Sequence, residues 1–119
     1  MYIINLVEKA LNIRTSYHKV ISGNIANVET PGYKSKDMDF KKEIDRAINS
    51  GANSSIISGN IEVTENPGND GLASIDGNTV NVENEIVKLT ENQVMFHSLI
   101  QVAAKRFSMM KFLISEGKR

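Results

Sequence analysis

The sequence predicts a mainly α-helical protein in which two long terminal helices form an antiparallel α-hairpin or coiled coil. Apolar residues recur at heptad spacing in both terminal arms, which is the pattern of helices that pack along a seam. Between the arms, residues 47–81 include 17 Gly, Asn or Ser residues and no Lys, Arg or aromatic residue. We therefore expect an N-terminal axial helix and turn (1–33), a short helix followed by a flexible central segment that contains a candidate β-hairpin (34–81), and a C-terminal axial helix (82–119). The first and last of these should form one helical domain.

The composition excludes several classes of protein. The chain has 119 residues, 14 basic and 14 acidic side chains, and no cysteine, so it has no disulfide scaffold, cysteine-ligated zinc or thiol nucleophile. Its apolar runs are far shorter than the roughly 18 residues of a membrane-spanning helix. Because Glu8 and Lys9 interrupt the first apolar stretch, we also expect no cleavable signal peptide. A net charge of zero offers no electrostatic case for binding nucleic acid.

Residues 4–28 are predicted to form the first helix. A second apolar row beside the heptad positions widens its apolar face, so the helix needs more than one neighbour. Proline disfavours the helical conformation at the residue before it, here Thr30, so the helix should end near residue 27 or 28. The heptad positions that we assign to an assembly seam are Ile4, Val7, Leu11, Ile21 and Ile25.

The helix should lead into a type II turn formed by Thr30, Pro31, Gly32 and Tyr33. Pro presets φ at the second position of such a turn, and Gly accepts a positive φ at the third. From the residues alone, the simplest interpretation is an ordinary helix followed by an ordinary turn. We expect Gly32 to be the least replaceable residue of the turn.

The centre of the chain predicts little regular structure. Residues 40–48 have the apolar spacing of a short helix, for which Asp39 is the expected N-cap. Residues 56–64 could form a short strand or a hairpin around a turn at 58–60. Residues 66–71 should be a loop, and its acids lack the spacing of a calcium-binding loop.

Residues 82–116 carry the strongest helical pattern of the chain. Asn81 can cap this helix, Glu83 and Glu85 suit the positive end of its dipole, and Gly117 is a reasonable stop. We expect Ile100 and Phe107 to be buried against another helix. The positions that complete the assembly seam are Ile86, Leu89, Phe96, Ile100, Phe107, Met110 and Ile114.

The length of the C-terminal helix favours assembly into something larger. At 1.5 Å per residue it would be roughly 52 Å long, whereas a compact chain of this size has a radius of gyration of about 13.5 Å. The N-terminal helix can cover one side of it, but the centre has too few large apolar residues to cover the rest. Apolar surface should therefore remain for partners.

We find no pattern of a catalytic, cofactor-binding or metal-binding site. His18 and His97 are isolated from other metal-ligating residues, and no glycine-rich phosphate-binding loop or nucleophile motif is present. The paired acids at predicted helix starts are explained by capping and by the helix dipole. We therefore expect the protein not to be an enzyme and to need no cofactor.

Residues 22–34 (SGNIANVETPGYK) resemble the signature shared by flagellar rod, hook and related axial proteins. The matching residues are Asn24, Ala26, Asn27, Thr30, Pro31, Gly32 and Tyr33. The segments at 36–40 and 77–93 are similar to proximal-rod members of this family. The C-type rod, distal-rod and hook proteins usually carry a Tyr-x-x-Asn pattern in the last helix, where this chain reads Phe-His-Ser-Leu at 96–99. The resemblance covers both arms and leaves out residues 47–81.

The resemblance implies a structural subunit of the bacterial flagellar basal-body rod. Such a subunit is exported through the flagellar type III apparatus without a cleaved signal peptide and assembles through its terminal helices into the periplasmic rod. There it would transmit torque and line the export channel. The partners implied are other rod subunits, the rod/MS-ring junction protein FliE and the export gate. The alternatives are a soluble coiled-coil adaptor or export chaperone, and a neighbouring C-type rod subunit.

Overall fold

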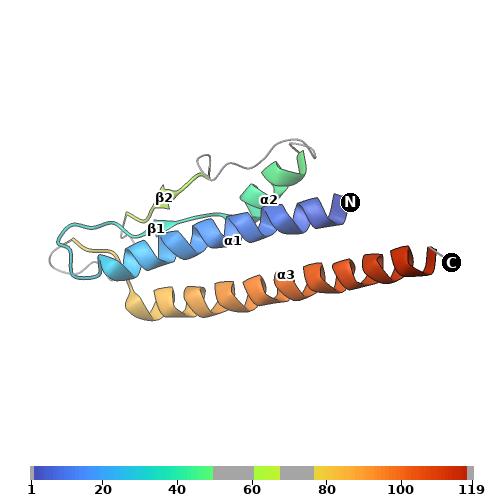
Figure 1. Ribbon diagram of the computed structural model, residues 1–119. Helices are drawn as coiled ribbons and strands as arrows, with labels where there is room; N and C mark the ends of the chain where they lie inside the picture. The colour runs from blue at the N-terminus through green and yellow to red at the C-terminus, as the bar shows by residue number, and fades with distance from the viewer. Residues whose placement is uncertain (1, 50–60, 68–76, 118–119) are drawn as a thin grey trace.

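The computed structural model describes residues 2–49, 61–67 and 77–117 of the chain, and within them it is mainly helical, as predicted (Figure 1). Two helices are long and one is short, and two strands of two residues each pair with one another. In chain order the elements are α1 (Tyr2–Ala26), β1 (Lys36–Asp37), α2 (Phe40–Asn49), β2 (Thr64–Glu65) and α3 (Val82–Gly117).

The long helices α1 and α3 lie side by side and antiparallel, so both termini are at the same end of the molecule (Figure 1). Helix α1 is the central layer, because α3 packs along one side of it while β1 and α2 pack on another. The molecule measures 71 × 26 × 19 Å and has a radius of gyration of 18.4 Å. A compact chain of this length would have a value of about 13.5 Å, so the predicted elongated hairpin is confirmed.

The helix boundaries agree with the sequence to within one or two residues. Helix α1 ends at Ala26, five positions before Pro31. The backbone N–H of Lys42 donates to Asp39 Oδ1 over 3.2 Å, and that of Asn84 donates to Asn81 Oδ1 over 3.3 Å. Both predicted N-caps therefore satisfy a helix-terminal donor.

The strand pairing was not predicted. Strand β2 pairs antiparallel with β1, with Lys36 opposite Glu65 and Asp37 opposite Thr64. The sequence indicated a strand near residue 64 but no partner for it at 36–37, because that segment is polar and lacks strand-forming residues. The turn predicted at 58–60 lies outside the described residues, so a local hairpin there stays a prediction.

The apolar core lies between α1, α2 and the segment that joins them. Ile13 is fully buried there and contacts Met38 and Ala47. Partly buried apolar side chains surround this cluster, namely Tyr17, Phe40, Ile44 and Ile61. The buried ammonium of Lys9 donates to the carbonyl of Ala47 over 3.3 Å, which satisfies one of the last carbonyls of α2. The core therefore holds α2 against the N-terminal half of α1.

The contact between α1 and α3 differs from the predicted seam. The buried residues of α3 are Glu85 and Asn92, both polar, and the positions at heptad spacing from them are half-buried. Ile100 and Phe107 remain 42% and 57% exposed, so this chain alone does not bury them. Along α3, Glu85 is buried in place of Ile86, and Leu99 is half-buried in place of Ile100, so part of the seam is shifted by one residue. Helix α3 also extends past the start of α1 (Figure 1).

Candidate assembly site

The signature residues gather where α1 leads into the turn at the closed end of the hairpin, opposite the two termini (Figure 1). The segment before α3, residues 77–80, lies against this turn through several hydrogen bonds. We call the end of α1 with the turn (24–33), residues 35–37, which include β1, residues 77–80 and the first two turns of α3 (82–88) the polar junction. It joins parts of the chain that are about 50 residues apart in sequence.

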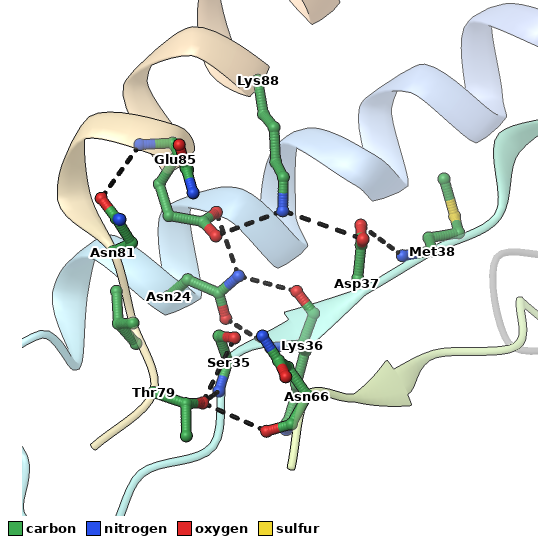
Figure 2. A network of polar contacts seen from close by, with 12 residues as sticks. Asn24, Ser35, Lys36, Asp37, Met38, Asn66, Thr79, Asn81, Glu85 and Lys88 are labelled. Carbon is green, nitrogen blue, oxygen red and sulfur yellow. Dashed lines mark hydrogen bonds and ion pairs between the residues drawn. The ribbon is translucent and has the colours of Figure 1, made fainter. Parts of the chain in front are cut away.

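Asn24 is the centre of the polar junction and is fully buried. Its side-chain amide pairs with the backbone of Lys36, since Nδ2 donates to the Lys36 carbonyl (2.7 Å) and Oδ1 accepts from the Lys36 N–H (2.9 Å). Nδ2 also donates to Glu85 Oε2 over 3.1 Å (Figure 2). One side chain of α1 therefore binds both β1 and α3. An aspartate could not replace it, because a carboxylate has no N–H to donate.

Glu85 is a buried carboxylate whose charge is paired. The ammonium of Lys88 lies 3.5 Å from Glu85 Oε1 and 3.8 Å from Asp37 Oδ2, so it bridges α3 and β1 (Figure 2). Burying a charge is costly unless it is paired and hydrogen-bonded. The sequence assigned Glu85 only to the helix dipole, whereas the structure also makes it a contact between the two long helices.

Asp37 also contacts Tyr17 on α1. Its Oδ1 accepts the backbone N–H of Met38 over 2.8 Å and the hydroxyl of Tyr17 over 3.5 Å. Burial, and secondarily the negative charge of Asp37, raise the pKa of Tyr17 to about 12. The neutral phenol is therefore the form that suits this site.

The turn after α1 has the geometry expected of a type II turn. Tyr33 N–H donates to the Thr30 carbonyl over 3.3 Å, and Gly32 has a φ of +74°. The hydroxyl of Thr30 donates to Asn27 Oδ1 over 3.1 Å, and Asn27 Nδ2 donates to the Gly23 carbonyl over 2.8 Å. The signature residues therefore terminate α1 and hold the turn that follows it.

Asn78 fastens the segment before α3 onto this turn. Its buried Nδ2 lies 2.9, 2.9 and 2.8 Å from the carbonyls of Asn27, Val28 and Thr30, in the segment that follows α1. Its Oδ1 accepts the backbone N–H of Val80 over 2.8 Å. The side chain thereby ties residues 77–80 to the segment that follows α1.

Thr79 continues the same attachment. Its backbone N–H donates to the Tyr33 carbonyl over 3.0 Å. Its hydroxyl accepts from the Ser35 N–H over 2.8 Å and lies 3.2 Å from the Asn66 carbonyl (Figure 2). The sequence indicated Asn78 and Thr79 only as part of a segment similar to proximal-rod proteins. Their contacts could not be predicted, because Asn and Thr within a Gly/Asn/Ser-rich segment are typical of loops without fixed partners.

The predicted signature residues divide into two groups. Asn24, Asn27 and Thr30 contribute side-chain hydrogen bonds, and Gly32 contributes its positive φ. Ala26 and Pro31 lie on the surface. Tyr33 is half-buried and takes part through its backbone.

The predicted seam is buried on α1 and largely exposed on α3. Val7 and Ile21 are buried, Leu11 and Ile25 are half-buried, and the Ile4 side chain lies outside what the structure describes. On α3, Leu89, Phe96 and Met110 are half-buried, while Ile86, Ile100, Phe107 and Ile114 are exposed.

The C-terminal turns of α3 form the largest run of exposed apolar side chains in the described part of the chain. At least half of each side chain is exposed, and the residues are Phe107, Met109, Phe112, Leu113 and Ile114. We call this set the distal face. At about 3.6 residues per turn, Phe107 and Ile114 lie on one side of α3, and Met109, Phe112 and Leu113 lie on the opposite side. Exposed apolar side chains of this number are typical of sites of protein–protein contact, here on both sides of the helix. Its position beyond the start of α1 leaves it open to another chain (Figure 1).

Within residues 2–49, 61–67 and 77–117, no three His, Asp or Glu side chains are grouped so that they could hold a metal ion. In the same residues, no helix combines the length and the apolar character that crossing a membrane requires.

Comparison with known proteins places these features in context. A family model described as flagella basal body rod protein matches residues 8–34, which include most of α1 and the turn. The chain is 25% identical to the flagellar basal body rod protein FlgB of Escherichia coli (strain K12), over 92% of this chain and 91% of that protein. It is 26% identical to FlgB of Bacillus subtilis (strain 168), over 97% of this chain and 95% of that protein. It is 28% identical to FlgB of Borrelia hermsii, over 93% of this chain and 94% of that protein.

Proposed function

Because the chain belongs to the family of flagellar basal body rod proteins, we propose that it is a structural subunit of the proximal part of the rod. The observation that carries this proposal is the combination of end-to-end similarity to rod proteins with an open apolar surface on α3. The family is structural, and the chain is not an enzyme.

Assembly would use the two terminal helices as one unit. In this proposal residues 1–33 and 82–119 form the axial domain, which the antiparallel packing of α1 on α3 supports. The apolar residues that α1 leaves uncovered, among them Ile100 and Phe107, would pack against helices of neighbouring subunits. The buried seam residues of α1, such as Ile21, would instead hold the subunit together. The coiled-coil character of the assembled helices is part of the same proposal.

The position in the rod is a finer proposal. We place the subunit at the base of the rod on the periplasmic side of the inner membrane, beside other rod subunits, the junction protein FliE and the export gate. Export without a cleaved signal peptide, a contribution to the wall of the export channel and the transmission of torque belong to the same proposal. The similarity of the signature and of the segment at 77–93 to proximal-rod proteins supports it.

The two alternative functions have less support. A soluble adaptor or export chaperone would use the same heptads but would leave the signature at the polar junction unexplained. A C-type rod subunit would fit the fold equally well. However, the relatives that match this chain over more than nine-tenths of their length are named FlgB.

Deleting the gene, restoring it with a tagged copy and looking for the tagged chain in basal bodies test the proposal. We expect that deleting the gene abolishes swimming and leaves basal bodies without a rod, and that an epitope-tagged copy restores both. Purified basal bodies from the restored strain should contain the tagged chain. Its absence from these particles, with swimming restored, would contradict the proposal and favour the adaptor.

A further inference from the structure

A cavity of about 400 Å3 lies between α1 and α3, partway along the hairpin and outside the polar junction. Both histidines of the chain line it, although they are 79 positions apart and showed no relation in the sequence. The lining residues are Arg14, Thr15 and His18 from α1, and Asn92, Gln93, Phe96 and His97 from α3.

Arg14 supplies a cationic group that the chain itself holds in place. Its guanidinium lies over the ring of Phe40, 3.5 Å from the ring centroid, and donates to Asn92 Oδ1 over 3.4 Å. Asn92 returns a hydrogen bond from Nδ2 to the Arg14 carbonyl over 3.0 Å. These contacts fix the side chain before any ligand arrives, which lowers the entropic cost of binding one.

One donor of this guanidinium lacks a partner. Arg14 Nε is buried, and no group of the described residues accepts its hydrogen. Burial also lowers the pKa of Arg14 from its usual value, although an arginine in a protein keeps its charge. Arg14 is half-buried, and no carboxylate of the described residues forms an ion pair with it. An anionic acceptor on the accessible part of the guanidinium would offset the cost of this partly buried charge.

The other residues that line the cavity also favour the binding of a carboxylate. None of them is acidic, and Gln93 and the two imidazoles can each donate a hydrogen bond. Glu91 acts on Arg14 electrostatically but is not among the lining residues. Phe96 provides an apolar wall that would cover the methylene groups of a side chain. The cavity therefore fits a carboxylate carried on a short apolar stem.

We propose that this cavity receives a Glu or Asp side chain from an adjacent rod subunit, with its carboxylate on Arg14. The proposal rests on the proposed function, because an adjacent subunit is the partner that rod assembly supplies. The carboxylate would accept charge-assisted hydrogen bonds from the guanidinium, which are stronger and more directional than those between neutral groups. Since the cavity is bounded by both helices, the contact would also fix how neighbouring hairpins are aligned.

Photo-crosslinking in cells identifies the occupant. A photoreactive benzophenone amino acid replaces Gln93, basal bodies are purified, and the crosslinked peptide is mapped by mass spectrometry. We expect a crosslink to a segment of another rod protein, or of a second copy of this chain, that contains an Asp or Glu beside the attachment point. A crosslink to a segment without an acidic residue would overturn the proposal. So would the absence of any crosslink between chains while the chain is present in the particles.

Charge reversal tests the interaction itself. Arg14→Glu should lower incorporation into basal bodies at least about tenfold, because like charges in contact cost several kcal/mol. Lys or Arg at the mapped acidic position of the partner should restore it. The control is Lys41→Glu, which reverses an exposed charge on α2 and should incorporate normally.

Folding is separated from binding by the helical circular dichroism of the purified Arg14→Glu chain. If the swapped pair fails to restore incorporation although this chain is folded, the carboxylate contact is wrong. A wild-type chain that is missing from basal bodies would instead contradict the proposed function.

Discussion

At the scale of single residues, the polar junction depends on amides in positions that other side chains cannot fill. Asn24 offers a donor and an acceptor to the backbone of Lys36 and a further hydrogen bond to Glu85. The amide nitrogen of Asn78 lies within hydrogen-bond distance of three carbonyls in the segment that follows α1. Because the Asn24 and Asn78 side chains are buried, a buried amide N–H that loses its acceptor is left unsatisfied, at about 1–3 kcal/mol.

Gly32 is the residue of the turn that we expect to tolerate substitution least. Its φ of +74° is strained for other residues, although a Cβ there would meet no neighbouring atom. The left-handed conformation costs an L-residue about 1–2 kcal/mol, and more if it is β-branched. Gly32→Val should therefore reduce swimming and the amount of chain in basal bodies, whereas Gly32→Asn should retain most of both.

The matched control for this experiment is Gly117→Ala, at the last residue of α3, where a Cβ also meets nothing and φ is not positive. It should assemble normally. If Gly32→Val assembled and swam like the wild type, the turn would not be needed for assembly.

Tyr17 should reveal its contact with Asp37 in an alkaline titration. Its folded-state pKa of about 12 lies above the ordinary value of about 10. The contribution of Tyr17 to stability is therefore complete below about pH 10 and is lost as the pH rises toward 12. Tyrosinate absorbance should show a late ionisation that Tyr17→Phe removes. If the ionisation that Tyr17→Phe removes has the ordinary tyrosine pKa, then Tyr17 is neither buried nor in contact with Asp37 as described.

At the scale of elements, α3 has two apolar stripes, and only one of them meets α1. The half-buried stripe runs through Leu89 and Phe96 at heptad spacing from the buried Glu85 and Asn92. The exposed stripe runs from Ile86 through Ile100 to Phe107 and Ile114 of the distal face. This arrangement gives the helix one surface for its own chain and another for a neighbour.

Phe107 tests the role of the exposed stripe. It is 57% exposed in the single chain, so an aspartate there should leave the isolated subunit intact. In an assembly it would be buried against a neighbouring helix, where losing a Phe side chain typically costs about 3–5 kcal/mol. Phe107→Asp should therefore be exported but absent from purified basal bodies.

Ser108→Asp is the control, because it adds the same charge at the next position of α3, on an exposed polar side chain. It should incorporate better than Phe107→Asp. Normal incorporation of Phe107→Asp would show that Phe107 does not lie in an assembly contact.

The helices could be predicted from the sequence because their signals are local. The periodicity lies within the helices, and the caps Asp39 and Asn81 lie directly at their starts. The stripe that faces α1 could not be predicted, because α3 is apolar at both candidate stripes and the choice depends on Glu85 and Asn92 finding partners.

The turn in the polar junction could be predicted because its signal is also local. The turn around Gly32 has a local signature, whereas Asn78 finds its acceptors about 50 positions earlier in the chain. The pairing of β1 with β2 and the approach of His18 to His97 likewise depend on the folded hairpin.

At the scale of the whole molecule, the chain buries little apolar surface for its length. The buried apolar side chains of the described residues lie in α1, α2 and the segment between them, and they are Val7, Ala10, Ile13, Ile21, Met38 and Ala47. Ordering each residue costs about 1–2 kcal/mol of backbone entropy. The C-terminal half of α3 gains little from burial to offset this cost.

We therefore expect the free monomer in dilute solution to be marginally stable, with frayed terminal arms that become ordered on assembly. Amide hydrogen exchange should show weak protection along the outer parts of α1 and α3. Amides near the polar junction should be the better protected ones. Strong protection across both Ile4–Val28 and Ile86–Ile114 would show that the chain folds completely alone.

The central claim is that this chain is a rod subunit that assembles through its terminal helices. The most direct test is an electron cryo-microscopy map of purified basal bodies at a resolution that shows side chains. We predict that the chain lies in the wall at the base of the rod, with Phe107 and Ile114 buried between the helices of neighbouring subunits. A rod base built entirely of other proteins, or one in which the distal face of α3 points into solvent, would contradict the claim.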